Sequence, residues 1–121
     1  MRRRNKDSLI CEKSLNFAVR IVKFYKYLCE EKKEYVLSKQ ILRSGTSIGA
    51  NIRESRNAQS NADFINKLNI ALKEADETQY WLELFRFSEI ITEESYNSLN
   101  KDLEELISML VAAIKTMKSK L

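Results

Sequence analysis

The chain has 121 residues, of which 44% are hydrophobic and 31% are charged, so it is long enough to form one domain with its own core. It contains no proline and only two glycines, the residues that punctuate strands and β-turns, and this composition predicts an all-α protein. Apolar runs are shorter than the ~18 residues of a membrane-spanning helix, and the basic N-terminus lacks the apolar stretch of a secretory signal. We therefore expect a cytoplasmic protein with no membrane partner.

The formal net charge of +4 is concentrated at the N-terminus. Positive and negative side chains balance after Lys6, so the excess belongs to the first six residues. We predict that residues 1–7 form a flexible basic arm in front of a bundle domain over residues 8–121. Such an arm can bind the phosphates of RNA or DNA, and a solubilising terminus is the alternative. The arm residues assigned to nucleic-acid binding are Arg2, Arg3, Arg4 and Lys6.

The first predicted helix runs from about Ser8 to Glu30. It holds both cysteines, Cys11 and Cys29, which lie ~27 Å apart along a helix and therefore cannot form a disulfide, since that bond needs Cα atoms within ~7 Å. The charged run EEKKE at 30–34 ends the apolar pattern. The apolar row of this helix, in steps of three, four or seven residues, is Ile10, Phe17, Ile21, Phe24 and Leu28.

Three further amphipathic helices follow in chain order, over about residues 35–56, 61–88 and from 93 onward. Ser60 and Asp63 have the spacing of a capping box at the start of the third helix, and Thr92 is placed to cap the fourth. Four such helices with short polar connections predict an up-down-up-down four-helix bundle. A long two-helix coiled coil that dimerises is the alternative, and the polar breaks between the helices argue against it.

Gly45 and Gly49 lie four residues apart in the segment SGTSIGANI of the second helix. A phosphate-binding loop would need a lysine after the glycines and a strand before them, and both are missing. Helical spacing places the two glycines on one face, where another helix can approach closely and offset the roughly 1 kcal/mol that each glycine costs. A kinked helix is the alternative interpretation.

Two mixed polar rows on the second and third helices carry complementary groups. We predict that Arg43 pairs with Glu74 or Glu77, within a subunit or between subunits, and a solvated charged face is the alternative. Trp81 is expected to fill the core or an interface. The rows are Arg43, Ser47, Asn51 and Glu54 on the second helix, and Glu74, Glu77 and Trp81 on the third.

The sequence contains no histidine, which removes the usual general base and the Glu-x-x-His motif of di-iron bundles. The pair Glu74 and Glu77 is by itself an ordinary helix-surface pattern. We therefore predict no catalytic residues, no metal site and no cofactor, and we expect that the protein is not an enzyme.

The segment YVLSKQILRSGTSIGANI at 35–52 resembles the second-helix signature of a known family. DFINKL at 63–68, ALKEA at 71–75 and ETQYWL at 77–82 resemble its third-helix signature. The family is the small bacterial four-helix bundle proteins called 23S rRNA intervening-sequence proteins, also labelled S23 ribosomal proteins. The resemblance implies assembly into a ring-like homo-oligomer, with a pentamer favoured. It also implies a relationship to a protein that assists the reverse transcriptase of diversity-generating retroelements and binds nucleic acid.

Two hypotheses for function follow. The first is a non-enzymatic oligomeric bundle that binds RNA or DNA as an accessory factor, supported by the basic arm and by the resemblance. The second is a protein–protein interaction scaffold without nucleic-acid binding, supported by the lack of a basic stripe on the predicted bundle. Since the aromatic residues form no base-stacking platform, nucleic-acid binding is expected to be electrostatic and tolerant of sequence.

Overall fold

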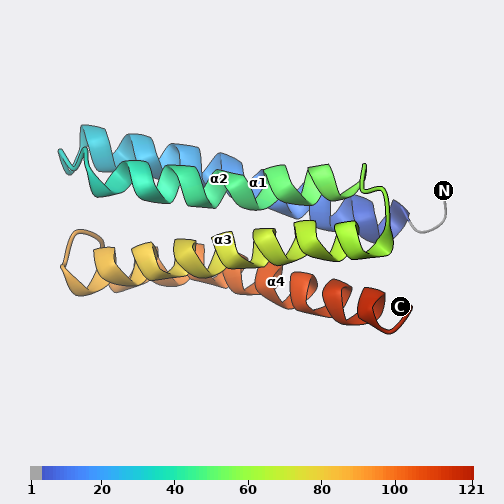
Figure 1. Ribbon diagram of the computed structural model, residues 1–121. Coiled ribbons are helices and arrows are strands. Elements are labelled where there is room, and N and C mark those ends of the chain that lie inside the picture. Colours follow the sequence, from blue (N-terminus) through green and yellow to red (C-terminus); the bar gives the residue numbers. More distant parts are fainter. Residues whose placement is uncertain (1–3) are drawn as a thin grey trace.

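The computed structural model describes residues 4–121 and contains four α-helices (Figure 1). Residues 1–3 lie outside this part, and of residues 4–8 only the backbone is described. The described chain has no strand, so the predicted all-α, four-helix fold is confirmed. None of its helices combines the length and the apolar character that crossing a membrane requires. The helices are α1 (Arg4–Glu30), α2 (Leu37–Ser55), α3 (Asn61–Phe87) and α4 (Glu93–Lys118).

The start of α1 differs from the sequence-based expectation. We expected a helix from about Ser8, and the helix begins at Arg4. The segment RNKD contains no glycine or proline, and arginine and lysine are good helix formers, so the helix can begin before Ser8. Arg4 and Lys6 therefore lie in α1, while Arg2 and Arg3 lie outside the described residues.

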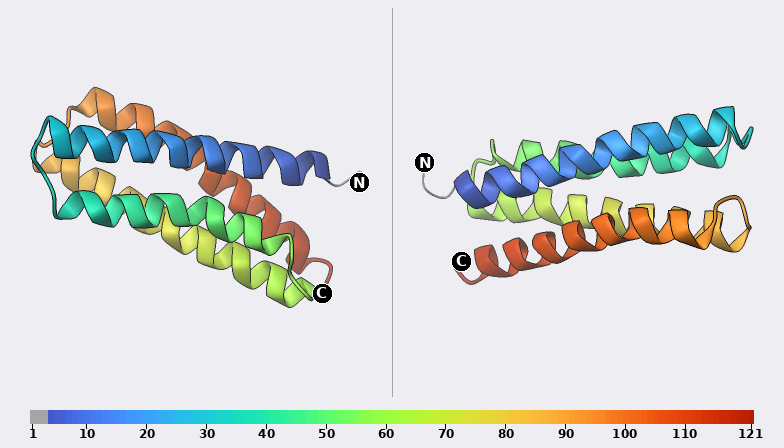
Figure 2. Two further views of the ribbon diagram at one scale, coloured as in Figure 1. Left: turned by 90° about the horizontal axis from the view of Figure 1, so that it is seen from above. Right: turned by 180° about the vertical axis from the view of Figure 1, so that it is seen from behind.

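The four helices alternate in direction, and each contacts its neighbour in sequence. α1 also contacts α4, which closes the bundle, but this α1–α4 seam makes the fewest contacts of the four helix pairs (Figure 2). The start of α1, the α2–α3 connection and the end of α4 all lie at one end of the bundle. The α1–α2 and α3–α4 connections lie at the opposite end.

The core runs along the bundle axis and uses the apolar rows predicted from the sequence. Phe24 of α1 meets Phe85 of α3 edge to face, with ring centroids 6.0 Å apart. Ile10 is only partly buried, because it lies where α1 approaches the open end of the seam. The largest fully buried side chains are Phe17, Phe85, Ile21, Leu28, Ile41, Ile48, Ile52, Leu68, Leu82, Leu103, Leu106 and Leu110.

Side-chain oxygens cap the starts of three helices. As predicted, Ser60 accepts a hydrogen bond from the Asp63 N–H at 3.0 Å, and Thr92 accepts one from the Ser95 N–H at 3.1 Å. The Glu34 carboxylate accepts from three successive N–H groups at the start of α2, the shortest being 2.6 Å. This third cap was not predicted, because Glu34 had been assigned to a charged connection.

Candidate functional site

Gly45 and Gly49 lie where α2 packs against α1. A Cβ atom on Gly45 would lie 2.8 Å from Cγ1 and 2.9 Å from Cγ2 of Ile21, which is fully buried. A Cβ atom on Gly49 would lie 3.2 Å from the hydroxyl and 3.3 Å from the backbone oxygen of Ser14. Neither glycine has a positive φ, so the backbone conformation does not require them. Gly45 instead lacks the room for a side chain because Ile21 of α1 occupies it, and Gly49 has only a tight space beside Ser14 of α1.

Arg43 of α2 lies between two carboxylates of α3. Its Nη1 is 3.2 Å from Oε1 of Glu74, and its Nη2 donates to Oε2 of Glu77. The indole N–H of Trp81 donates to the same Glu77 oxygen at 3.1 Å. The hydrogen bonds from Arg43 and from Trp81 hold the pKa of Glu77 below its usual range. The structure thus brings four of the seven residues of the polar rows into one network within a single chain.

The remaining residues of the second-helix row divide into two kinds. Glu54 reaches α3, where its Oε1 lies 3.0 Å from Nζ of Lys67. Ser47 and Asn51 instead donate to carbonyl oxygens one turn earlier in α2, at 2.7 and 2.9 Å. In this row, only Arg43 and Glu54 therefore form ion pairs with α3. We call the ion pairs of Arg43 with Glu74 and Glu77 and of Glu54 with Lys67 the α2–α3 ladder.

This ladder links α2 to α3 through ion pairs. Each carboxylate in it already has a cationic partner, and the lowered pKa of Glu77 keeps this group ionised near neutral pH. A buried hydrogen bond also joins α2 and α3, because the Thr78 hydroxyl donates to the Ser44 hydroxyl at 2.9 Å. Among the described residues, no group of three histidine, cysteine or carboxylate side chains has the arrangement of a metal site.

Cationic side chains gather at the end of the bundle where the chain begins. The antiparallel order of α1 and α4 brings the last turn of α4 to the same end as the first turn of α1 (Figure 1). Residues 111–121 contain three lysines and no aspartate or glutamate. Among residues 9–121, the exposed cations of this basic end are Arg53, Arg56, Lys115, Lys118 and Lys120.

Sequence reasoning missed this basic end, although the signal was present. Lys115 and Lys118 complement the negative end of the α4 dipole, and this local role does not show which other cations lie nearby. The predicted up-down-up-down order already implied that the first and fourth helices would bring their outer ends together. The topology and the positions of the charges together would therefore have predicted that the N-terminal and C-terminal cations lie at the same end of the bundle.

At the same end, the α1–α4 seam opens into a groove of about 980 Å³. Leu9 and Ile10 of α1 form one wall, and Met109, Ala112 and Met117 of α4 form the other. Phe64 of α3 and the α2–α3 connection, including Gln59, Ser60 and Asn61, complete the lining. The cations Arg56 and Lys120 also line this groove, and no carboxylate does among the described residues.

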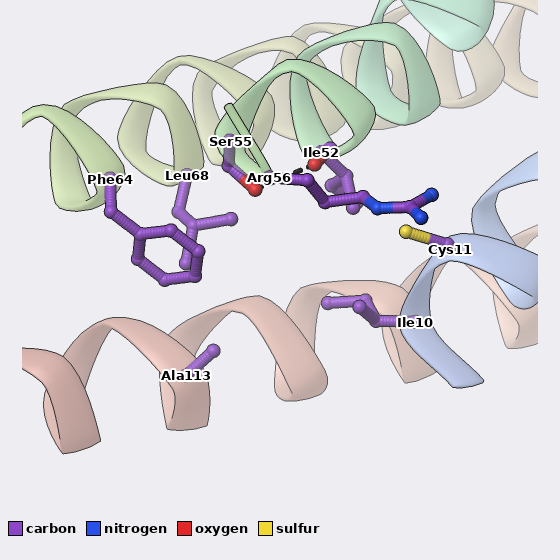
Figure 3. A pocket seen from close by; sticks show the side chains of 8 residues that line it. All are labelled: Ile10, Cys11, Ile52, Ser55, Arg56, Phe64, Leu68 and Ala113. Carbon is purple, nitrogen blue, oxygen red and sulfur yellow. Dashed lines mark hydrogen bonds between the residues drawn. The ribbon is translucent and has the colours of Figure 1, made fainter. Parts of the chain in front are cut away.

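A small cavity of about 30 Å³ lies beside the groove, toward the core (Figure 3). Phe64 and Leu68 of α3 face Ala113 of α4 across it, and Arg56 extends toward α1. Cys11 is also part of its lining, and both Cys11 and Cys29 are free thiols, as predicted. This cavity is too small for a ligand larger than water, so the groove is the only one of the two that can accept a partner.

Comparison with known proteins places these features in a family. Residues 6–112 match the family model described as 23S rRNA-intervening sequence protein. A crystal structure of a protein with unknown function, from the S23 ribosomal protein family of Bacteroides thetaiotaomicron, is 64% identical in sequence. The alignment covers 91% of this chain and 98% of that chain, with a TM-score of 0.89. No curated protein matches the chain.

Proposed function

We propose that this chain, which belongs to the 23S rRNA-intervening sequence protein family, is a non-enzymatic bundle that forms a homo-oligomer and binds RNA or DNA as an accessory factor. The observation that carries nucleic-acid binding is the basic end. Cations of α2 and α4 are exposed there, beside the start of α1, which follows directly on Arg2 and Arg3. A cluster of cations attracts a phosphate backbone because binding releases counterions from the nucleic acid.

The charge pattern along the sides of the bundle strengthens this choice of surface. Several side-chain cations there are paired with carboxylates of neighbouring helices, as in Arg20 with Asp102 at 2.8 Å and Lys13 with Glu105 at 3.2 Å. At the basic end, no described carboxylate forms an ion pair with Lys115, Lys118 or Lys120. Unpaired cations contribute more to binding a polyanion than paired ones, since the pairs must first be broken.

The proposal of a homo-oligomer is supported by the outer face of α1. Leu15, Val19 and Val22 follow the i, i+4, i+7 spacing of one helix face and are 51%, 46% and 38% exposed. An apolar stripe on the solvent side of a helix is a feature of interaction surfaces. A ring of subunits would also place several basic ends on one assembly, so that weak contacts add through effective concentration.

A salt series tests nucleic-acid binding. Affinity for RNA and for duplex DNA is measured for the intact protein, for Lys118→Gln with Lys120→Gln, and for a control, Lys26→Gln with Lys39→Gln. The control residues are exposed lysines near the opposite end of the bundle. For the first variant, we expect the slope of log affinity against log salt to become less steep by about 0.7 to 0.9 for each lost phosphate contact.

The control variant should bind with the slope of the intact protein. If the intact protein binds neither nucleic acid at low salt, nucleic-acid binding is wrong and the scaffold hypothesis replaces it. If both variants lose the same slope, the basic end is not the binding surface. Substitution is preferred to truncation here, because removing the first residues would also shorten α1.

A further inference from the structure

We propose that the groove at the basic end binds an amphipathic α-helix of a partner protein, apolar along one face and carrying carboxylates beside it. The groove is lined by Leu9 and Ile10 of α1, by the α2–α3 connection and by the last turns of α4. This partner is distinct from the nucleic acid of the proposed function, and the inference does not depend on it.

The groove exists because α1 and α4 separate toward this end of the bundle (Figure 2). The ion pairs of Arg20 with Asp102 and of Lys13 with Glu105 hold the two helices together further along. Beyond Glu105, the side of α4 that faces α1 lines the groove. Its side chains there are Met109, Ala112, Ala113, Thr116 and Lys120, in steps of one, three or four residues.

The shape of the groove suits a helix. From Met109 to Lys120 the row is ~17 Å long, which is about three helical turns. Ala112 and Thr116 are exposed along it, so the groove is open lengthwise rather than closed around a small ligand. Ala112 and Ala113 leave room for a partner backbone to approach, and the two methionines can adjust to its side chains. This matches the recognition of an amphipathic helix in an apolar groove.

The charges of the groove select an acidic partner. Arg56 and Lys120 line it, and no described carboxylate does. Lys115 and Lys118 are exposed on the same last turns of α4. A nucleic acid would meet these cations but would leave Leu9, Met109 and Met117 uncovered, because phosphates gain nothing from apolar contact. An apolar helix flanked by carboxylates satisfies both parts of the surface.

The experiment uses three fluorescein-labelled peptides of about 18 residues, titrated with the full chain and followed by fluorescence anisotropy. The first carries leucines along one helical face and glutamates beside them. The second has lysine in place of every glutamate, and the third is a scrambled form of the first. We expect the Kd of the glutamate peptide to be roughly tenfold lower than that of either of the others.

Two matched variants locate the binding site. Ala112→Gln places a neutral, polar side chain in the groove, and Ala50→Gln makes the same change on an exposed position of α2. Both replace an exposed helical alanine by a good helix former, so both proteins should fold. We expect Ala112→Gln to weaken the glutamate peptide at least fivefold and to leave RNA binding unchanged, whereas Ala50→Gln should change neither.

Three results would overturn the inference. The first is equal binding of all three peptides, and the second is an equal effect of the two variants. The third is absence of peptide binding together with a lower oligomer mass for Ala112→Gln, which would mean that a second copy of this chain occupies the groove. Failure of RNA binding alone would refute the proposed function and leave this inference intact.

Discussion

Replacing Gly45 by alanine tests whether the contact between α1 and α2 is as close as the structure shows. The new Cβ atom would lie 2.8 and 2.9 Å from the two γ carbons of Ile21. Both distances are well below the 3.5–4.0 Å at which carbon atoms pack favourably. Ile21 cannot swing away cheaply, since a β-branched side chain in a helix has one strongly preferred χ1 rotamer and this one is fully buried.

Two opposing terms set the size of the effect. Alanine in place of glycine inside a helix stabilises by roughly 1 kcal/mol, whereas forcing one extra carbon into a packed interface costs about 1–3 kcal/mol. We expect the second term to dominate at Gly45 and the free energy of unfolding to fall by about 1 kcal/mol. At Gly49 the contacts with Ser14 are longer, at 3.2 and 3.3 Å, so the two terms should cancel to within about 0.5 kcal/mol.

The assay is urea unfolding followed by circular dichroism, at one fixed protein concentration because an oligomer makes stability depend on concentration. Ile21→Ala is measured alone and together with Gly45→Ala. If the two side chains clash, the double variant should lose less free energy than the sum of the single ones, with a coupling of about 1 kcal/mol. A Gly45→Ala protein that is more stable than the original, with additive losses in the double variant, would refute the close contact.

Two further predictions concern the network between α2 and α3. Arg43→Ala should lower the free energy of unfolding by about 1 kcal/mol, since the half-exposed Arg43 joins two carboxylates. A change below about 0.5 kcal/mol in urea unfolding would identify a solvated face instead. Glu77 has a pKa lowered by folding, so the stability it contributes is present above its unfolded pKa of about 4.3 and is lost as the pH falls through the folded pKa. Glu77→Gln should therefore reduce the loss of stability between about pH 6 and pH 3, and parallel curves for the two proteins would contradict this.

The helices were predictable because their signals are local. The row containing Phe17 and Ile21 follows helical spacing, and Ser60 is followed at the right distance by Asp63, so periodicity and capping identify the elements without knowledge of the packing. The predicted start of α1 at Ser8 was wrong, because a basic arm and a basic helical turn have the same composition. Membership of the family was predicted correctly from the signatures on the second and third helices.

The groove could not be predicted from the sequence. Met109, Ala112 and Met117 look like ordinary members of an apolar helix face, and nothing in their spacing shows that α1 separates from them. That separation depends on the angle between two whole helices, which many side chains determine together. The basic end differs, because it requires only the topology and the positions of the charges, and both were available from the sequence.

The four seams of the bundle are held by different kinds of contact, and this explains why the groove opens where it does. Between α1 and α2, the packing is so close that a Cβ atom at position 45 would clash with Ile21. Between α2 and α3, the buried hydrogen bond of Thr78 with Ser44 adds to the ion pairs. The α1–α4 seam has the fewest contacts, and its ion pairs are solvent-exposed, with Arg20 at 38% and Asp102 at 45%. Exposed pairs contribute about 0–1 kcal/mol each, so these ion pairs add little to the stability of the α1–α4 seam. A partner helix that enters this seam therefore displaces little of what stabilises the bundle, while it covers apolar side chains that the chain alone leaves in contact with water.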